Sequence, residues 1–178
     1  TPLYIACSRG HLKVVQVLLT TKEIQINQAK ENGATPLYDA CEEGHSEIVQ
    51  VLLTRKEIEI NQAVKKGATP LFIACQKGHC DVVKELLNAI GIQANQARND
   101  GATPLIIATY LGNSSIVKLL LSIDGIDEFA TCKDKTAVQY AEANVRLASW
   151  STLDDEINEE GRIECVKFFL TKPRNNPQ

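Results

Sequence analysis

The chain of 178 residues has no methionine, one tryptophan and only 5% aromatic residues, although 44% of its residues are hydrophobic. Its core must therefore be built from leucine, isoleucine, valine and alanine. No apolar run approaches the roughly 20 residues of a membrane-spanning helix, and the start does not have the pattern of a secretory signal. We therefore expect no membrane insertion. Because the chain opens at Thr1 without an initiator methionine, we also expect more chain to precede it in the natural protein.

The sequence also lacks a large excess of positive or negative charge. Nineteen lysines and arginines stand against 22 aspartates and glutamates, which gives a net charge of −3. Because phosphate backbones are bound by clustered basic surfaces, nucleic acid is not an expected partner. The hydrophobic fraction and the 23% of charged residues are close to globular averages, which excludes wholesale disorder. The length alone suggests one domain or two.

What the sequence does contain is an internal repeat. The segments TPLYIACSRGH, TPLYDACEEGH, TPLFIACQKGH and TPLIIATYLGN begin at Thr1, Thr35, Thr69 and Thr103, 34 residues apart. A weaker copy, TAVQYAEAN, begins at Thr136. Self-similarity at such a period predicts a solenoid, in which each unit buries its apolar face against its neighbours.

Each copy predicts two short helices and a polar link. Threonine is a good N-cap, and the proline after it is tolerated in the first turn of a helix. A glycine ends the first helix, and apolar pairs about a turn apart then indicate a second helix with one buried face. Another glycine marks a turn in the link. The helix-ending glycines are Gly10, Gly44, Gly78 and Gly112, and the link glycines are Gly33, Gly67 and Gly101.

With these motifs the chain resembles the ankyrin repeat family, whose unit of about 33 residues has a T-P-L-H-x-A signature followed by G-H and a helix rich in valine and leucine. The resemblance extends from Thr1 to about Leu170. It implies an all-α fold, an ankyrin-repeat solenoid of stacked helix-turn-helix units with short β-hairpin or turn loops. The histidine of the family signature is replaced by Tyr4, Tyr38, Phe72 and Ile106.

We expect a single domain, 1–178, made of the units 1–34, 35–68, 69–102, 103–135 and 136–178. The fifth unit is longer because residues are inserted at about 145–160, and we interpret it as a degenerate C-terminal cap. The insertion carries Trp150 and several acidic residues.

The spacing Cys-x-x-x-His occurs three times, and it suggests either a zinc site or a nucleophile with its base. A glycine between the two residues ends the helix, so we favour a buried cysteine and a histidine that caps the loop. No phosphate-binding loop or hydrolase motif accompanies the pairs. We expect no metal, no cofactor and no enzymatic activity. The pairs are Cys7/His11, Cys41/His45 and Cys75/His79.

The same cysteines hold equivalent positions on successive helices, which pack about 8–10 Å apart. A disulfide needs Cα atoms within about 7 Å of each other. Free thiols are typical of a reducing compartment, so we expect a cytoplasmic location, with the nucleus as the alternative. We also expect a monomer.

The resemblance implies a concave face, formed by the link tips and the first helices, that binds a protein or peptide. This face is acidic in the second unit, basic in the third and apolar in the fourth, where Tyr110 and Leu111 replace polar residues. The alternative is that these two side chains pack under the insertion, against Trp150. The predicted contacts are Asp39, Glu42, Glu43, Lys65, Lys66, Ile73, Gln76, Lys77, Ile107, Tyr110, Leu111 and Tyr140.

We therefore predict a non-catalytic interaction module or scaffold. One alternative is an autoregulatory domain of a larger enzyme or channel. Another is that the array is a substrate of an asparagine hydroxylase at Asn61, which has a leucine eight residues before it and an acid two before it. The simpler interpretation is that Asn61 and its counterparts Asn27 and Asn95 bond the backbone of the turn.

Overall fold

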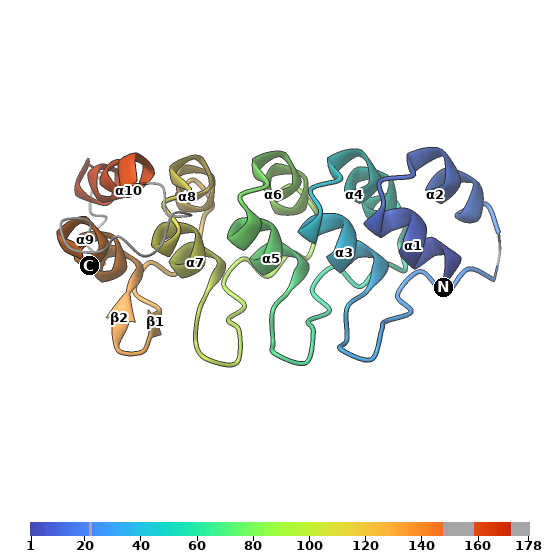
Figure 1. The fold of residues 1–178 in the computed structure, drawn as a ribbon, viewed down its shortest axis with the longest axis horizontal. Coiled ribbons are helices and arrows are strands. Elements are labelled where there is room, and N and C mark those ends of the chain that lie inside the picture. The colour runs from blue at the N-terminus through green and yellow to red at the C-terminus, as the bar shows by residue number, and fades with distance from the viewer. Residues whose placement is uncertain (22, 148–158, 172–178) are drawn as a thin grey trace.

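The computed structural model is a row of helix pairs with links projecting from one edge (Figure 1). It describes residues 1–21, 23–147 and 159–171. The predicted stacked-helix solenoid is confirmed. The first helices of the pairs are α1 (Pro2–Ser8), α3 (Pro36–Glu42), α5 (Pro70–Lys77), α7 (Pro104–Tyr110) and α9 (Ala137–Leu147). The second helices are α2 (Leu12–Leu18), α4 (Ser46–Leu53), α6 (Cys80–Leu87), α8 (Ser114–Leu121) and α10 (Glu159–Thr171).

The threonine–proline pairs begin the first helices as predicted. In α5 the hydroxyl of Thr69 accepts a hydrogen bond from the backbone N–H of Phe72 at 3.1 Å, and Pro70 occupies the first turn. The same cap forms at the start of α1, α3 and α7. One otherwise unpaired N–H is satisfied at each of these starts, which is worth about 1 kcal/mol per helix.

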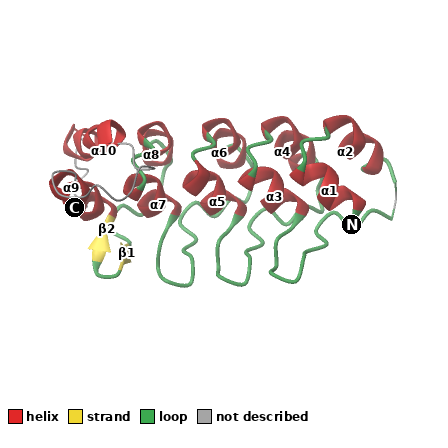
Figure 2. Cartoon of the chain, viewed as in Figure 1, coloured by secondary structure: helices red, strands yellow, loops and turns green. Residues whose placement is uncertain are grey.

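The links close as hairpin-like turns and contact one another. The last link contains β1 (Thr131–Cys132) and β2 (Lys135–Thr136), an antiparallel pair that is coloured yellow in Figure 2. In the earlier links a backbone hydrogen bond across the turn closes the loop. In the second link, for example, the N–H of Val64 donates to the carbonyl of Ala68 at 3.0 Å. Successive tips are joined as well, because Lys65 donates its N–H to the carbonyl of Asn32 at 2.9 Å.

Stacking is what buries the apolar face of each unit. Ile48, Val82 and Ile116 hold the same position in three successive second helices, and each is 1% exposed. Val14 holds that position in the first unit and is 48% exposed. These side chains are therefore covered by the preceding unit, and each burial contributes about 1.5–3 kcal/mol. The stability of the array thus comes from junctions between neighbours.

Asparagines form a second set of junctions, along the side of the second helices. The Nδ2 of Asn61 donates to the carbonyl of Gly91 at 2.8 Å, and its Oδ1 accepts from the N–H of Gln93 at 3.0 Å. Asn27 and Asn95 make the same two bonds one unit away on either side. Each asparagine therefore bonds the backbone of the next link, rather than its own turn as the sequence suggested.

The fifth pair differs from the others. Its first helix, α9, has 11 residues, whereas α7 has seven. The flanks of the predicted insertion are therefore helical, since α9 ends at Leu147 and α10 begins at Glu159. Residues 148–158, with Trp150, lie outside the described residues. In the last link the repeat position of the asparagines is occupied by Phe129, which is 85% exposed.

None of the helices in the described ranges combines the length and the hydropathy needed to cross a membrane.

Candidate partner-binding surface

The inner face is defined here as the exposed side of the first helices together with the link tips. Neighbouring first helices pack on each other more extensively than neighbouring second helices do. Ten of the twelve predicted contact residues are at least partly exposed on this face. They are Glu42, Glu43, Lys65, Lys66, Gln76, Lys77, Ile107, Tyr110, Leu111 and Tyr140.

Asp39 and Ile73 are the exceptions, because they are 4% and 5% exposed. They hold equivalent positions on α3 and α5. Neither side chain reaches the surface, so the contact surface is narrower than the sequence predicts. A helical pattern shows which residues share a face, but it does not show what the neighbouring units cover.

Burial makes Asp39 a charged group in an unfavourable place. Its carboxylate lies 3.2 Å from the Nζ of Lys30, while its other oxygen, Oδ1, has no hydrogen-bond partner among the described residues. Burial raises the pKa of Asp39, and the hydrogen bond and charge of Lys30 oppose that rise. The Nζ of Lys30 also lies 4.0 Å from the centre of the Tyr4 ring. Lys30 therefore ties the first link to two first helices.

The same arrangement recurs two units later. The guanidinium of Arg98 lies 5.0 Å from the centre of the Phe72 ring. Arg98 has the same repeat position as Lys30, and Phe72 has the same repeat position as Tyr4. A cation over an aromatic face is worth about 0.5–1 kcal/mol at an exposed site. Tyr4 and Phe72, two of the aromatic residues that replace the histidine of the repeat signature, thus each support a cation from the following link.

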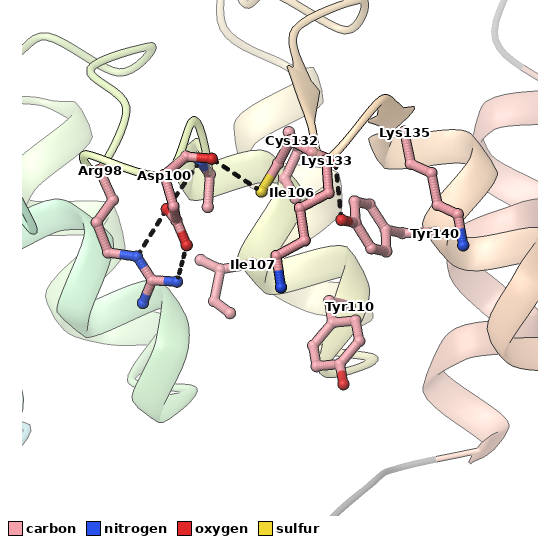
Figure 3. Close-up of a pocket in the computed structure, with 10 residues that line it drawn as sticks. Arg98, Asp100, Ile106, Ile107, Tyr110, Cys132, Lys133, Lys135 and Tyr140 are labelled. Carbon is pink, nitrogen blue, oxygen red and sulfur yellow. Dashed lines mark hydrogen bonds and ion pairs between the residues drawn. The ribbon is translucent and has the colours of Figure 1, made fainter.

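A pocket opens on the inner face between the last two links, α7 and α9 (Figure 3). Its volume is about 420 Å³. The base is apolar, and lysines from β2 and from the tip of the last link stand at the rim. The lining residues are Arg98, Asp100, Ala102, Ile106, Ile107, Tyr110, Cys132, Lys133, Lys135 and Tyr140.

Hydrogen bonds fix the wall of this pocket. Arg98 Nε donates to Asp100 Oδ1 at 2.9 Å, and this bond is the largest cause that lowers the pKa of Asp100 to about 2. The thiol of Cys132 donates to the carbonyl of Asp100 at 3.3 Å, and the hydroxyl of Tyr140 donates to the carbonyl of Cys132 at 2.8 Å. The two links and α9 are thereby held together, and Asp100 is neutralised by its own arginine (Figure 3).

Tyr110 and Tyr140 meet edge to face at the α9 side of the pocket. Their ring centres are 5.8 Å apart, and the planes are inclined at 88°. Tyr110 is nevertheless 38% exposed. The alternative contact with Trp150 falls outside the described residues, so Tyr140 is the aromatic neighbour that the structure provides.

Of the residues that line the pocket, Ile107, Tyr110 and Tyr140 are among the predicted contacts, and Arg98, Cys132 and Ile106 are among those that sequence reasoning missed. The sequence does contain a signal for Arg98. Lys30 and Arg98 hold the same repeat position, and each follows an aromatic residue, Tyr4 or Phe72, at the same spacing. The bond from Cys132 to the Asp100 carbonyl could not be inferred, since it depends on how closely successive links approach.

The Cys-x-x-x-His pairs have a structural role. His45 Nε2 lies 3.2 Å from the carbonyl oxygen of Ser8, and His79 makes the same contact with Glu42, so these rings point to the preceding unit. Cys7, Cys41 and Cys75 are buried free thiols, and burial raises their pKa, to about 12 for Cys7. The interpretation as core cysteines is confirmed. The histidines make no side-chain cap bond at the start of their own second helix, and His45 and His79 instead contact the carbonyl at the end of the preceding unit's first helix. In the part of the chain described, no group of three potential metal ligands occurs.

A family model described as ankyrin repeats (3 copies) matches residues 1–64 and 58–132. The chain belongs to the ankyrin repeat family. No curated protein matches it. The ankyrin units matched by the model include the whole of α7 and the first strand of the last link, while α9 and α10 follow them.

Proposed function

We propose that this ankyrin array is a non-catalytic interaction module that binds a protein or peptide on its inner face, across the second to fifth units. The observation that supports this proposal best is the apolar group at the base of the pocket. Tyr110 is partly exposed beside Ile107, and Tyr140 is partly exposed next to them. Leu111, which follows Tyr110 in the chain, is partly exposed outside the pocket lining. Interface energy concentrates in such aromatic and aliphatic anchors when polar groups surround them.

The test is capture of a partner by the purified array from a cell extract. Tyr110→Ala combined with Leu111→Ala should abolish the capture of a protein that the unmodified chain retains. The loss of the edge contact with Tyr140 should lower the free energy of unfolding by about 0.5–1.5 kcal/mol, which leaves the array folded. Ile90→Ala is the matched control, because Ile90 is a fully exposed apolar residue in the loop after α6. Undiminished capture by the double variant would remove these residues from the binding site.

Two other roles remain predictions. An autoregulatory role would require a catalytic or channel segment in the same natural chain. Hydroxylation of Asn61 would add one oxygen to the mass of its peptide, although both ends of the Asn61 amide are already engaged by the next link. The six free cysteines support the proposal of a reducing, intracellular location.

A further inference from the structure

The charges around the pocket do not cancel. Arg98 and Asp100 form an ion pair, which leaves Lys133 and Lys135 of the last link. In the part of the chain that the structure describes, neither lysine has an ion-pair partner. Asp134 lies between them at the hairpin tip, but it is not part of the pocket lining. The rim of the pocket therefore has an excess of two positive charges.

The two lysines lie on either side of the Tyr140 ring (Figure 3). The side chain of Lys133 extends from the hairpin toward Ile107 and Tyr110 (Figure 3). The Nζ of Lys135 lies 5.8 Å from the centre of the Tyr140 ring. Both lysines are exposed, whereas Ile106 beneath them is 3% exposed. The pocket thus combines an apolar base with a cationic rim.

This combination fits a peptide better than a nucleic acid or a small ligand. A nucleic acid needs a long basic surface, and the same inner face carries two exposed acids, Glu31 in the first link and Glu43 directly after α3. A drug-sized ligand buries about 70–90% of its surface in its site, which a pocket with exposed lysines along its rim does not provide. A peptide can place one side chain in the pocket and keep its backbone on the surface.

We propose that the pocket between α7, α9 and the last two links receives an acidic peptide segment of the partner. A carboxylate of the segment lies against Lys133 and Lys135, and a neighbouring aliphatic or aromatic side chain packs beside Tyr110 and Ile107. This inference rests on the proposed function and specifies the chemistry of the partner. The apolar side chain supplies most of the affinity, since its burial is worth about 1.5–3 kcal/mol. The exposed lysines orient the segment and select against basic sequences.

The chain offers a matched control for the lysines. Lys13 on α2 and Lys56 in the loop after α4 are also exposed and lie outside the inner face. The pocket lining does not include them. Reversing both charges of either pair changes the net charge of the protein by the same amount, so a general electrostatic effect would be equal for the two pairs.

The experiment selects peptides from a random phage-displayed library on the immobilised full chain and then measures the affinity of the enriched peptides. The expected peptides carry Asp or Glu next to an aliphatic or aromatic residue. Lys133→Glu with Lys135→Glu should weaken their binding about tenfold, since two exposed charge contacts of up to about 1 kcal/mol each are reversed. Lys13→Glu with Lys56→Glu should change the binding less than about threefold. A peptide in which the acid is replaced by lysine should regain affinity for the Lys133/Lys135 variant.

Several results would overturn the inference. These are selection of neutral or basic peptides that still depend on Tyr110, an equal effect of the two lysine pairs, and a failure to enrich any peptide. None of these results contradicts the proposed function, which is decided by capture from a cell extract with the Tyr110/Leu111 variant. If capture and peptide binding are both indifferent to Tyr110 and Leu111, the proposed site fails as well.

Discussion

His79 Nε2 lies 2.9 Å from the carbonyl oxygen of Glu42, across the junction between the second and third units. A carbonyl oxygen accepts only, so Nε2 carries the proton in this contact. The corresponding residue of the fourth unit is Asn113, whose Nδ2 donates to the carbonyl of Cys75 at 2.9 Å. The carbonyl of Cys75 is one residue before Gln76, the counterpart of Glu42 in the third unit. The shorter asparagine therefore bonds a carbonyl that lies one residue earlier in the unit than the carbonyl bonded by histidine.

His79→Ala should lower the free energy of unfolding by about 1–3 kcal/mol, because a partly buried carbonyl at the end of α3 loses its partner. His79→Asn is the informative companion, since Asn113 shows that an amide can bridge a junction of this kind. It should recover at least half of the loss in urea unfolding. Equal losses for the two variants would show that ring packing, rather than the hydrogen bond, holds the junction.

Two link glycines allow backbone strain to be separated from crowding. Gly67 and Gly91 both have positive φ, 83° and 85°. A Cβ on Gly91 would meet nothing within 4 Å, whereas one on Gly67 would lie 2.7 Å from the backbone nitrogen of Asn99. Gly91→Ala should cost about 1–2 kcal/mol from the left-handed conformation alone. Gly67→Ala should cost at least about 1 kcal/mol more, because it also displaces Asn99 and its hydrogen bonds to the preceding tip. Similar urea midpoints for the two variants would contradict this view of the contact between tips.

The buried carboxyl of Asp39 makes stability depend on pH in an unusual direction for an acid. Its pKa is raised above the ordinary 3.8, chiefly by burial. The folded state therefore holds this proton more tightly than the unfolded state. Proton binding by Asp39 contributes fully to the free energy of unfolding below about pH 3.8, and this contribution is lost as the pH rises through the raised pKa of the folded state.

Asp39→Ile should raise the free energy of unfolding at pH 7 by about 1–2 kcal/mol, since it replaces a desolvated charge with the residue found at the equivalent positions Ile5, Ile73 and Ile107. This advantage over the unmodified chain should shrink as the pH is lowered toward 3.8. Lys30→Ala should have the opposite effect at pH 7, because the carboxylate stays buried without its cation. Thermal melts of the three proteins between pH 4 and 7 would measure both effects. A constant difference between Asp39→Ile and the unmodified chain would contradict the argument.

Local signals in the sequence were enough to predict the helices and their stacking. The threonine at each helix start and the apolar pairs of the second helices act within one unit, so their consequences can be read directly. The partners of Asn61 and His79 could not be predicted in the same way, since they lie 30–37 residues away and depend on the geometry of the stack. The burial of Asp39 and Ile73 was missed for the same reason. Tyr110 was recognised because it departs from the polar residues of its repeat position.

The asparagine bonds, the histidine contacts and the paired link tips all connect a unit to its immediate neighbour. A pulling force on the two ends of the chain acts on all the junctions in series, and one junction can therefore break while the bonds of the others stay intact. Each released unit of 34 residues would add about 110–120 Å of extended chain. The array can thus lengthen in steps while the remaining units keep their fold, which gives it the mechanical character of a spring with separate, recoverable segments.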